Sequence, residues 1–218
     1  MTSNSKLLIH FTKEELAEAL RPHFEEFHNQ LSEHQKRQIN FDQVVHSSYK
    51  RLNFYGKAPF HFREEKFQQQ AGLSPCTMAI ATVVADAFGI VFQFLGINEK
   101  ETRAATRALL AELGEDTLRG LRAKIHDIAN ATTIFQKAKE IWGLVSEVKN
   151  VVGFSGIVKA LKDSMHWYDW VITGATAVAQ LTAWFATDGV AFVAELALEG
   201  VYVAQLVEDA VNAVNCCG

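Results

Sequence analysis

The chain has 218 residues, of which 49% are hydrophobic and 21% charged, and its formal net charge is −4. This composition is that of a globular protein, which excludes wholesale disorder, and the acidic balance argues against a general nucleic-acid binder. The length suits one domain with its own core, or one such domain with an appendage.

The opening stretch MTSNSKLLIHFTKEEL lacks the long apolar segment of a signal peptide. We therefore expect synthesis in the cytoplasm, and release from the cell would need a non-classical route. The cysteines are Cys76, Cys216 and Cys217. Three residues with two of them adjacent are too few and too clustered to predict a disulfide framework.

Residues 1–70 are predicted to form a helical arm or cap. A first helix is expected over 12–38, because Thr12 can cap it and Glu15 stands at the capping-box spacing. Pro22 lies inside that pattern and predicts a kink or a break. The aromatic and charged stretch 54–75 has no clean period and is interpreted as a loop.

Residues 71–218 are predicted to form a helical bundle. Ser74 and Pro75 are typical of an N-cap and a first helical position, and Asn98 is expected to cap the next helix with Glu101 three residues later. Strand alternation is absent, so the fold class is all-α, a compact multi-helix bundle with a buried apolar C-terminal helical hairpin over 166–214. The helices are expected at about 75–96, 98–114, 116–130, 132–150, 155–164, 166–187 and 189–214.

Three segments are apolar nearly all round the helix. Residues 76–97 contain only Asp86 as a charge, and 170–187 contain no formal charge over 18 positions, which is the lower limit for a membrane span. Residues 189–207 are interrupted by Glu195 and Glu199. Such helices need a jacket of other helices or a lipid environment.

Charge is distributed unevenly along the chain. The last 56 residues hold seven acids and no Lys or Arg, whereas the first 162 have a formal charge of +3. Neighbouring carboxylates raise one another's pKa, and a protonated carboxyl enters a bilayer at lower cost than a charged one. This pattern predicts an acid-triggered insertion with pH-switch residues Asp188, Glu195 and Glu199 and inserting aromatics Trp170, Trp184 and Phe185.

A second interpretation of the acids is a charge match within the protein. They would face the basic helices over 119–139, whose cations are Arg119, Arg122, Lys124, Lys137 and Lys139.

The organisation of roughly residues 98–214 resembles the pore-forming domains of bacterial toxins, such as the channel colicins and the diphtheria translocation domain. The resemblance implies a soluble protein that inserts a sheathed hydrophobic hairpin into a membrane. No diagnostic motif accompanies it, so no functional residue is carried over. Glu195 and Glu199 depart from the more purely apolar hairpins of the channel colicins.

Two other classes compete with a membrane function. One is a helical interaction or ligand-binding protein without a membrane role, which would bind a protein partner or form a homo-oligomer through its apolar helices. The other is a di-metal helical oxidase, because Glu25-x-x-His28 has the spacing of di-iron bundles and Asp163-x-x-His166 is analogous. No catalytic motif or cofactor site is evident, so an enzyme is the less favoured class. Membrane lipid or a protein is the expected partner.

Overall fold

The structure is a computed structural model that describes residues 73–218 and scattered positions between residues 12 and 46. The chain divides into two compact units, Met1–Ala58 and Pro59–Gly218. Most of the predicted arm over 1–70 lies outside the described residues. The helical bundle belongs to the second unit.

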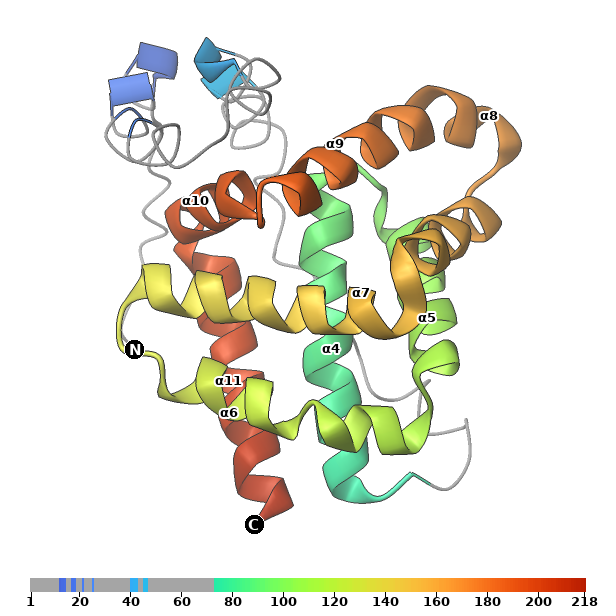
Figure 1. Cartoon of the computed structure of the whole chain (residues 1–218), viewed down its shortest axis with the longest axis vertical. Coiled ribbons are helices and arrows are strands. Elements are labelled where there is room, and N and C mark those ends of the chain that lie inside the picture. The colour runs from blue at the N-terminus through green and yellow to red at the C-terminus, as the bar shows by residue number, and fades with distance from the viewer. Residues whose placement is uncertain are drawn as a thin grey trace, which may run out of the picture. The chain divides into compact units, whose positions relative to one another are not determined.

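Every regular element between residues 73 and 218 is a helix, which confirms the all-α fold class (Figure 1). Strand alternation is absent from the sequence there, and the apolar residues recur at helical spacing. In chain order the elements are α4 (Pro75–Phe94), α5 (Glu99–Gly120), α6 (Arg122–Asn130), α7 (Ile134–Ser164), α8 (Trp167–Asp169), a π-helical turn (Trp170–Gly174), α9 (Ala175–Ala186), α10 (Val190–Leu198) and α11 (Gly200–Cys217).

Two of the predicted N-caps, Ser74 and Asn98, are confirmed. The backbone N–H of Thr77 donates to Ser74 Oγ at 3.2 Å, with Pro75 at the first helical position, and the N–H of Glu101 donates to Asn98 Oδ1 at 3.0 Å. These bonds satisfy amide groups that the first turn of a helix leaves without a partner. They place the starts of α4 and α5 where the sequence predicts them.

Helix α4 is the centre of the bundle. Of its 20 residues, 15 are buried, and α5, α7 and α11 all pack against it. Because it is apolar on every side, it has no face suited to water, and the surrounding helices supply the cover. Figure 1 shows α4 and α11 side by side with α7 crossing them.

Two glycines kink helices where the sequence predicts boundaries. Gly114 in α5 has φ 66°, and Gly153 in α7 has φ 75°. Residues with a Cβ rarely adopt this backbone conformation, so glycine permits the bend. Each helix resumes after its kink, and each long element is therefore two helical segments that meet at an angle.

The C-terminal segment is divided more finely than expected. The helix predicted over 166–187 is α8, the π-helical turn and α9, and the one predicted over 189–214 is interrupted at Glu199, where φ is −93° and ψ is 55°. The axes of Gln180–Ala186, the second part of α9, and of α10 differ by 107°, with Gly189 at φ 73° between them. The two helices form a corner across the bundle (Figure 1).

A disulfide joins Cys76 to Cys217, whose Cα atoms are 4.8 Å apart across 141 residues of sequence. A single bond is not a disulfide framework, but the spacing of the cysteines in the sequence does not predict this pairing. The cause is tertiary: α11 runs antiparallel to α4 and brings the end of the chain back to the first turn of the central helix. Cys216 is exposed and keeps a free thiol.

Candidate functional site

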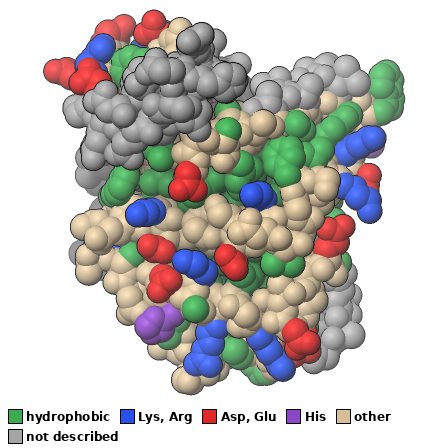
Figure 2. Space-filling model, in the orientation of Figure 1, with side chains coloured by type: hydrophobic (Ala, Val, Ile, Leu, Met, Phe, Trp, Pro, Cys, Tyr) green, Lys and Arg blue, Asp and Glu red, His purple; other side chains and the backbone are tan. Residues whose placement is uncertain are grey.

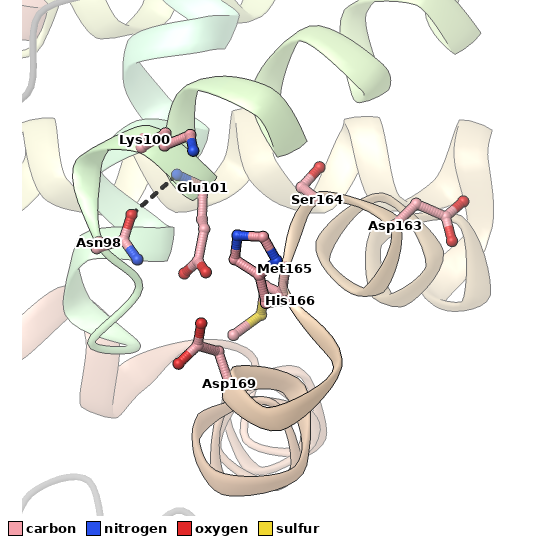
Figure 3. Close-up of a pocket in the computed structure, with 8 residues that line it drawn as sticks. All are labelled: Asn98, Lys100, Glu101, Asp163, Ser164, Met165, His166 and Asp169. Atoms are coloured by element: carbon pink, nitrogen blue, oxygen red, sulfur yellow. Dashed lines mark hydrogen bonds between the residues drawn. The ribbon is translucent and has the colours of Figure 1, made fainter.

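A polar cavity of about 420 Å³ lies where the start of α5 meets the end of α7 and the short α8. Figure 3 shows the carboxyl group of Glu101 facing Asp169 and the ring of His166, whereas Asp163 points away from them. The lining residues are Asn98, Lys100, Glu101, Asp163, Ser164, Met165, His166 and Asp169.

Glu101 is the buried acidic residue of this group. It stands in the first turn of α5, held there by the Asn98 cap, and only 6% of its surface is exposed. His166 immediately precedes α8 and Asp169 ends it, so the turn between α7 and α8 delivers both side chains to the cavity. Two segments that are about 65 residues apart in sequence thus build one site.

The pKa of Glu101 is raised above its usual value. Burial is the main cause, because removal from water penalises the charged form, and the negative charge of Asp169 adds to it. A hydrogen bond with the Asp169 side chain raises the pKa further, whereas the Asn98 side chain and the charge of His166 lower it. The protonated form of Glu101 is therefore favoured in this cavity.

The cavity carries excess negative charge. Over residues 73–218, no Lys or Arg forms an ion pair with Glu101 or Asp169, and the ion pairs shown there are Arg103–Glu99, Arg119–Glu115 and Lys124–Asp127. Two neighbouring carboxyl groups beside an imidazole can accept hydrogen bonds from a cationic donor. This is the chemistry that the geometry offers.

The di-metal hypothesis stays a prediction. Among the described residues, no group of three or more His, Cys, Asp or Glu side chains is placed to hold a metal ion. Asp163 and His166 both line the cavity, but their side chains diverge (Figure 3). Glu25 is an exposed helical residue, and His28 lies outside the described residues.

The aromatic residues predicted to enter a membrane belong to a packed cluster. Trp184 is 3% exposed and lies 5.0 Å from Phe192, and Phe185 lies 4.8 Å from Trp142, in both cases between ring centres. These contacts hold the α9–α10 corner against α7. Trp170 is half-buried against the same core.

The three predicted pH-switch carboxylates occupy different environments. Asp188 is exposed in the turn before α10, Glu195 is 5% exposed within α10, and Glu199 is half-buried at the break before α11. The break at Glu199 ends the single helical face on which the sequence places it with Glu195. Of the basic residues in the competing charge-match interpretation, Arg119 and Lys124 pair with neighbours on their own helices, and Arg122 donates to the backbone carbonyl of Gly218 at 2.9 Å.

Two described helices are long and apolar enough to cross a membrane, α4 and α7, and the bent pair α9–α10 adds a third if it counts as one span. Most of α4 is buried inside the bundle. On the face of the molecule drawn in Figure 2, hydrophobic side chains gather where α9 and α10 lie, and charged side chains of both signs lie below them. Large apolar side chains with substantial exposure include Trp167 at 78% and Val201 at 59%.

Sequence reasoning missed the cavity group. It treated Glu101 as a capping-box residue, His166 as part of an Asp-x-x-His spacing, and Asp169 as one of seven C-terminal acids. A carboxylate in the first turn of a helix is common without any site, because the helix dipole stabilises a negative charge there. The only available signal was that Asp169 stands three residues after His166 in a helix start, and this does not reveal the long-range contact with α5.

The fold and the site define a helical bundle around one apolar helix, with a polar cavity at its edge. No family model, curated protein or solved structure matches the chain. Its function is therefore inferred from the geometry of the bundle and the cavity.

Proposed function

We propose that this protein is a soluble helical bundle that inserts apolar helices into a membrane, in the manner of pore-forming or translocating toxin domains. The observation that carries the proposal is α4: 20 residues, one formal charge at Asp86, and burial inside a jacket of other helices. Its length matches what a bilayer core requires of a helix. A jacket that opens would expose this surface to lipid.

The outer surface supports an initial contact with lipid. Trp167 is the most exposed large apolar side chain among the described residues, and tryptophan favours the interface between lipid and water. Val201 and Leu198 add exposed apolar surface near the α10–α11 break. These side chains would adsorb to the headgroup region before any buried helix leaves the bundle.

Acid is the proposed trigger, with Glu195 as its principal carboxyl. This side chain is buried in the protein and would have to enter or approach lipid when the α9–α10 corner moves. A neutral carboxyl lowers the cost of that transfer. Glu195→Gln, which is always neutral, should therefore shift membrane activity toward neutral pH, whereas Asp188→Asn should not, because Asp188 is already in water.

The test uses the full chain, with and without dithiothreitol, and vesicles of phosphatidylcholine and phosphatidylglycerol between pH 7.5 and 4.5. Release of an entrapped dye should grow as the pH falls, and proteinase K should leave a lipid-protected fragment that contains residues 75–94. Digestion after detergent treatment of the vesicles is the control. A folded protein that gives neither dye release nor a protected fragment would contradict the proposal.

The cavity at Glu101 supports a second candidate function, the binding of a small organic cation. Its volume of about 420 Å³ exceeds what a single ion fills, and the buried Glu101 carboxyl faces it beside Asp169. An ammonium or guanidinium group would donate charge-assisted hydrogen bonds to the two carboxyl groups. This candidate is a ligand-binding protein without a membrane role.

Calorimetry with 1,4-diaminobutane and methylguanidine tests the second candidate. Both cations should bind with a measurable heat, and Glu101→Gln should abolish that binding. Glu99→Gln on the same helix but outside the cavity is the matched control. Equal heats for 1,4-butanediol, which has no charge, would exclude cation recognition.

A further inference from the structure

The antiparallel pair α4–α11 is fastened at both ends. At one end the Cys76–Cys217 disulfide joins the start of α4 to the end of α11. At the other, the rings of Phe94 and Tyr202 meet edge to face with centres 5.8 Å apart. Only the first of these fastenings is covalent.

We infer that the Cys76–Cys217 disulfide is a redox latch, which holds the apolar helix α4 against α11 and releases it on reduction. Both sulfur-bearing residues are partly exposed, at the surface end of the helix pair. The adjacent Cys216 is exposed and takes no part in the bond. The reducing agent can therefore reach the bond without prior unfolding of the core.

The chemical step is a two-electron reduction by a dithiol, of the thioredoxin class in a cell or dithiothreitol in the laboratory. A thiolate of the dithiol attacks one sulfur of the bond and forms a mixed disulfide, and its second thiol then displaces that sulfur. The products are the free thiols of Cys76 and Cys217 and the oxidised dithiol. No other reactant is needed.

The covalent bond keeps the two helices at a high effective concentration relative to each other, which opposes their separation. While it is intact, the last turn of α11 cannot move away from the first turn of α4, so each partial opening is quickly reversed by a partner at high effective concentration. The bond also ties α4 to Glu208 and Asp209, whose charges are costly in lipid. Reduction removes both restraints at once.

The redox latch rests on the proposed function only in its last step, because the release of α4 is measurable without lipid. Hydrogen exchange of the α4 amides is compared in the oxidised full chain, the same chain after dithiothreitol, and the variants Cys76→Ser and Cys216→Ser. Exchange of α4 should rise by at least about tenfold on reduction and in Cys76→Ser. Cys216→Ser keeps the bond and should match the oxidised wild type.

Dye release from the phosphatidylglycerol vesicles is then measured on the same samples. If α4 exchange is unchanged by reduction, or if reduction unfolds every helix together, the redox latch is overturned. If α4 loosens but no sample releases dye at any pH, the latch holds and the membrane function fails. Reoxidation of the reduced wild type should restore slow exchange, which excludes an effect of substitution.

Discussion

Gly189→Ala should be one of the most damaging single-methyl changes in the bundle. Gly189 joins α9 to α10 with φ 73°, a conformation that costs a residue with a Cβ about 1–2 kcal/mol. A Cβ built there would also overlap the indole ring of Trp142, which is 4% exposed. Relief of such an overlap in a packed core costs about 1–3 kcal/mol.

The sum predicts a loss of roughly 2–5 kcal/mol in the free energy of unfolding. Gly120→Ala is the matched control, since Gly120 ends a helix and a methyl group added to its Cα would meet no atom within 4 Å. That substitution should be neutral or stabilise by about 0.4–1 kcal/mol. The same chemical change should therefore destabilise the protein at Gly189 and be neutral or stabilising at Gly120.

Urea denaturation followed by circular dichroism measures both variants. A double-mutant cycle with Trp142→Leu separates the two costs of Gly189→Ala, because removal of the ring should leave only the backbone term. Equal stability of Gly189→Ala and the wild type would refute the placement of the α9–α10 corner against Trp142. Additive losses in the cycle would refute the steric part alone.

Three further predictions concern other parts of the bundle. The raised pKa of Glu101 favours the protonated form in the folded state, so this group stabilises the fold at pH values below its ordinary pKa of 4.5. That stabilisation is lost as the pH rises through the raised pKa of the folded state. Urea titrations at both ends of this pH window should show the wild type losing stability relative to Glu101→Gln as the pH rises. Cys76→Ser should lower the unfolding free energy by about 2–5 kcal/mol without reductant, and dithiothreitol should abolish its difference from the wild type in the same denaturation assay. Phe192→Ala should cost about 3–5 kcal/mol in thermal or urea unfolding, because this fully buried ring contacts Trp184, Trp142 and Phe94; a loss below about 1 kcal/mol would contradict that packing.

Local signals in the sequence predict the helices well because caps and breakers act over a few residues. Ser74, Pro75 and Asn98 mark helix starts by chemistry that needs no distant partner. Gly114 predicts a change of direction in the chain. Whether the helix ends or only kinks there depends on how the residues after Gly114 pack against the rest of the bundle. The break at Glu199 is marked locally only by Gly200, since neither neighbouring segment contains proline.

The site depends on contacts that the sequence does not encode locally. Glu101 and Asp169 meet because α7 returns the chain to the start of α5, and Cys76 meets Cys217 because α11 returns it to the start of α4. The periodicity of the apolar residues shows that α4 is buried but not which helix covers it. Trp184 and Phe185 illustrate the limit, because an aromatic pair suited to lipid is equally suited to a protein core.

The disulfide also decides how the protein responds to force. Suppose that a force pulls on the chain before Cys76 while the C-terminus is held. The sulfur–sulfur bond then carries the force, and the helices between the two cysteines bear no tension. The 141 residues of that separation would extend to about 490 Å at roughly 3.5 Å per residue, and this length stays hidden until the bond is reduced. In an optical trap, the extension of the oxidised and reduced chains should differ by that length. The force should unfold the helices of the reduced chain and leave those of the oxidised chain folded.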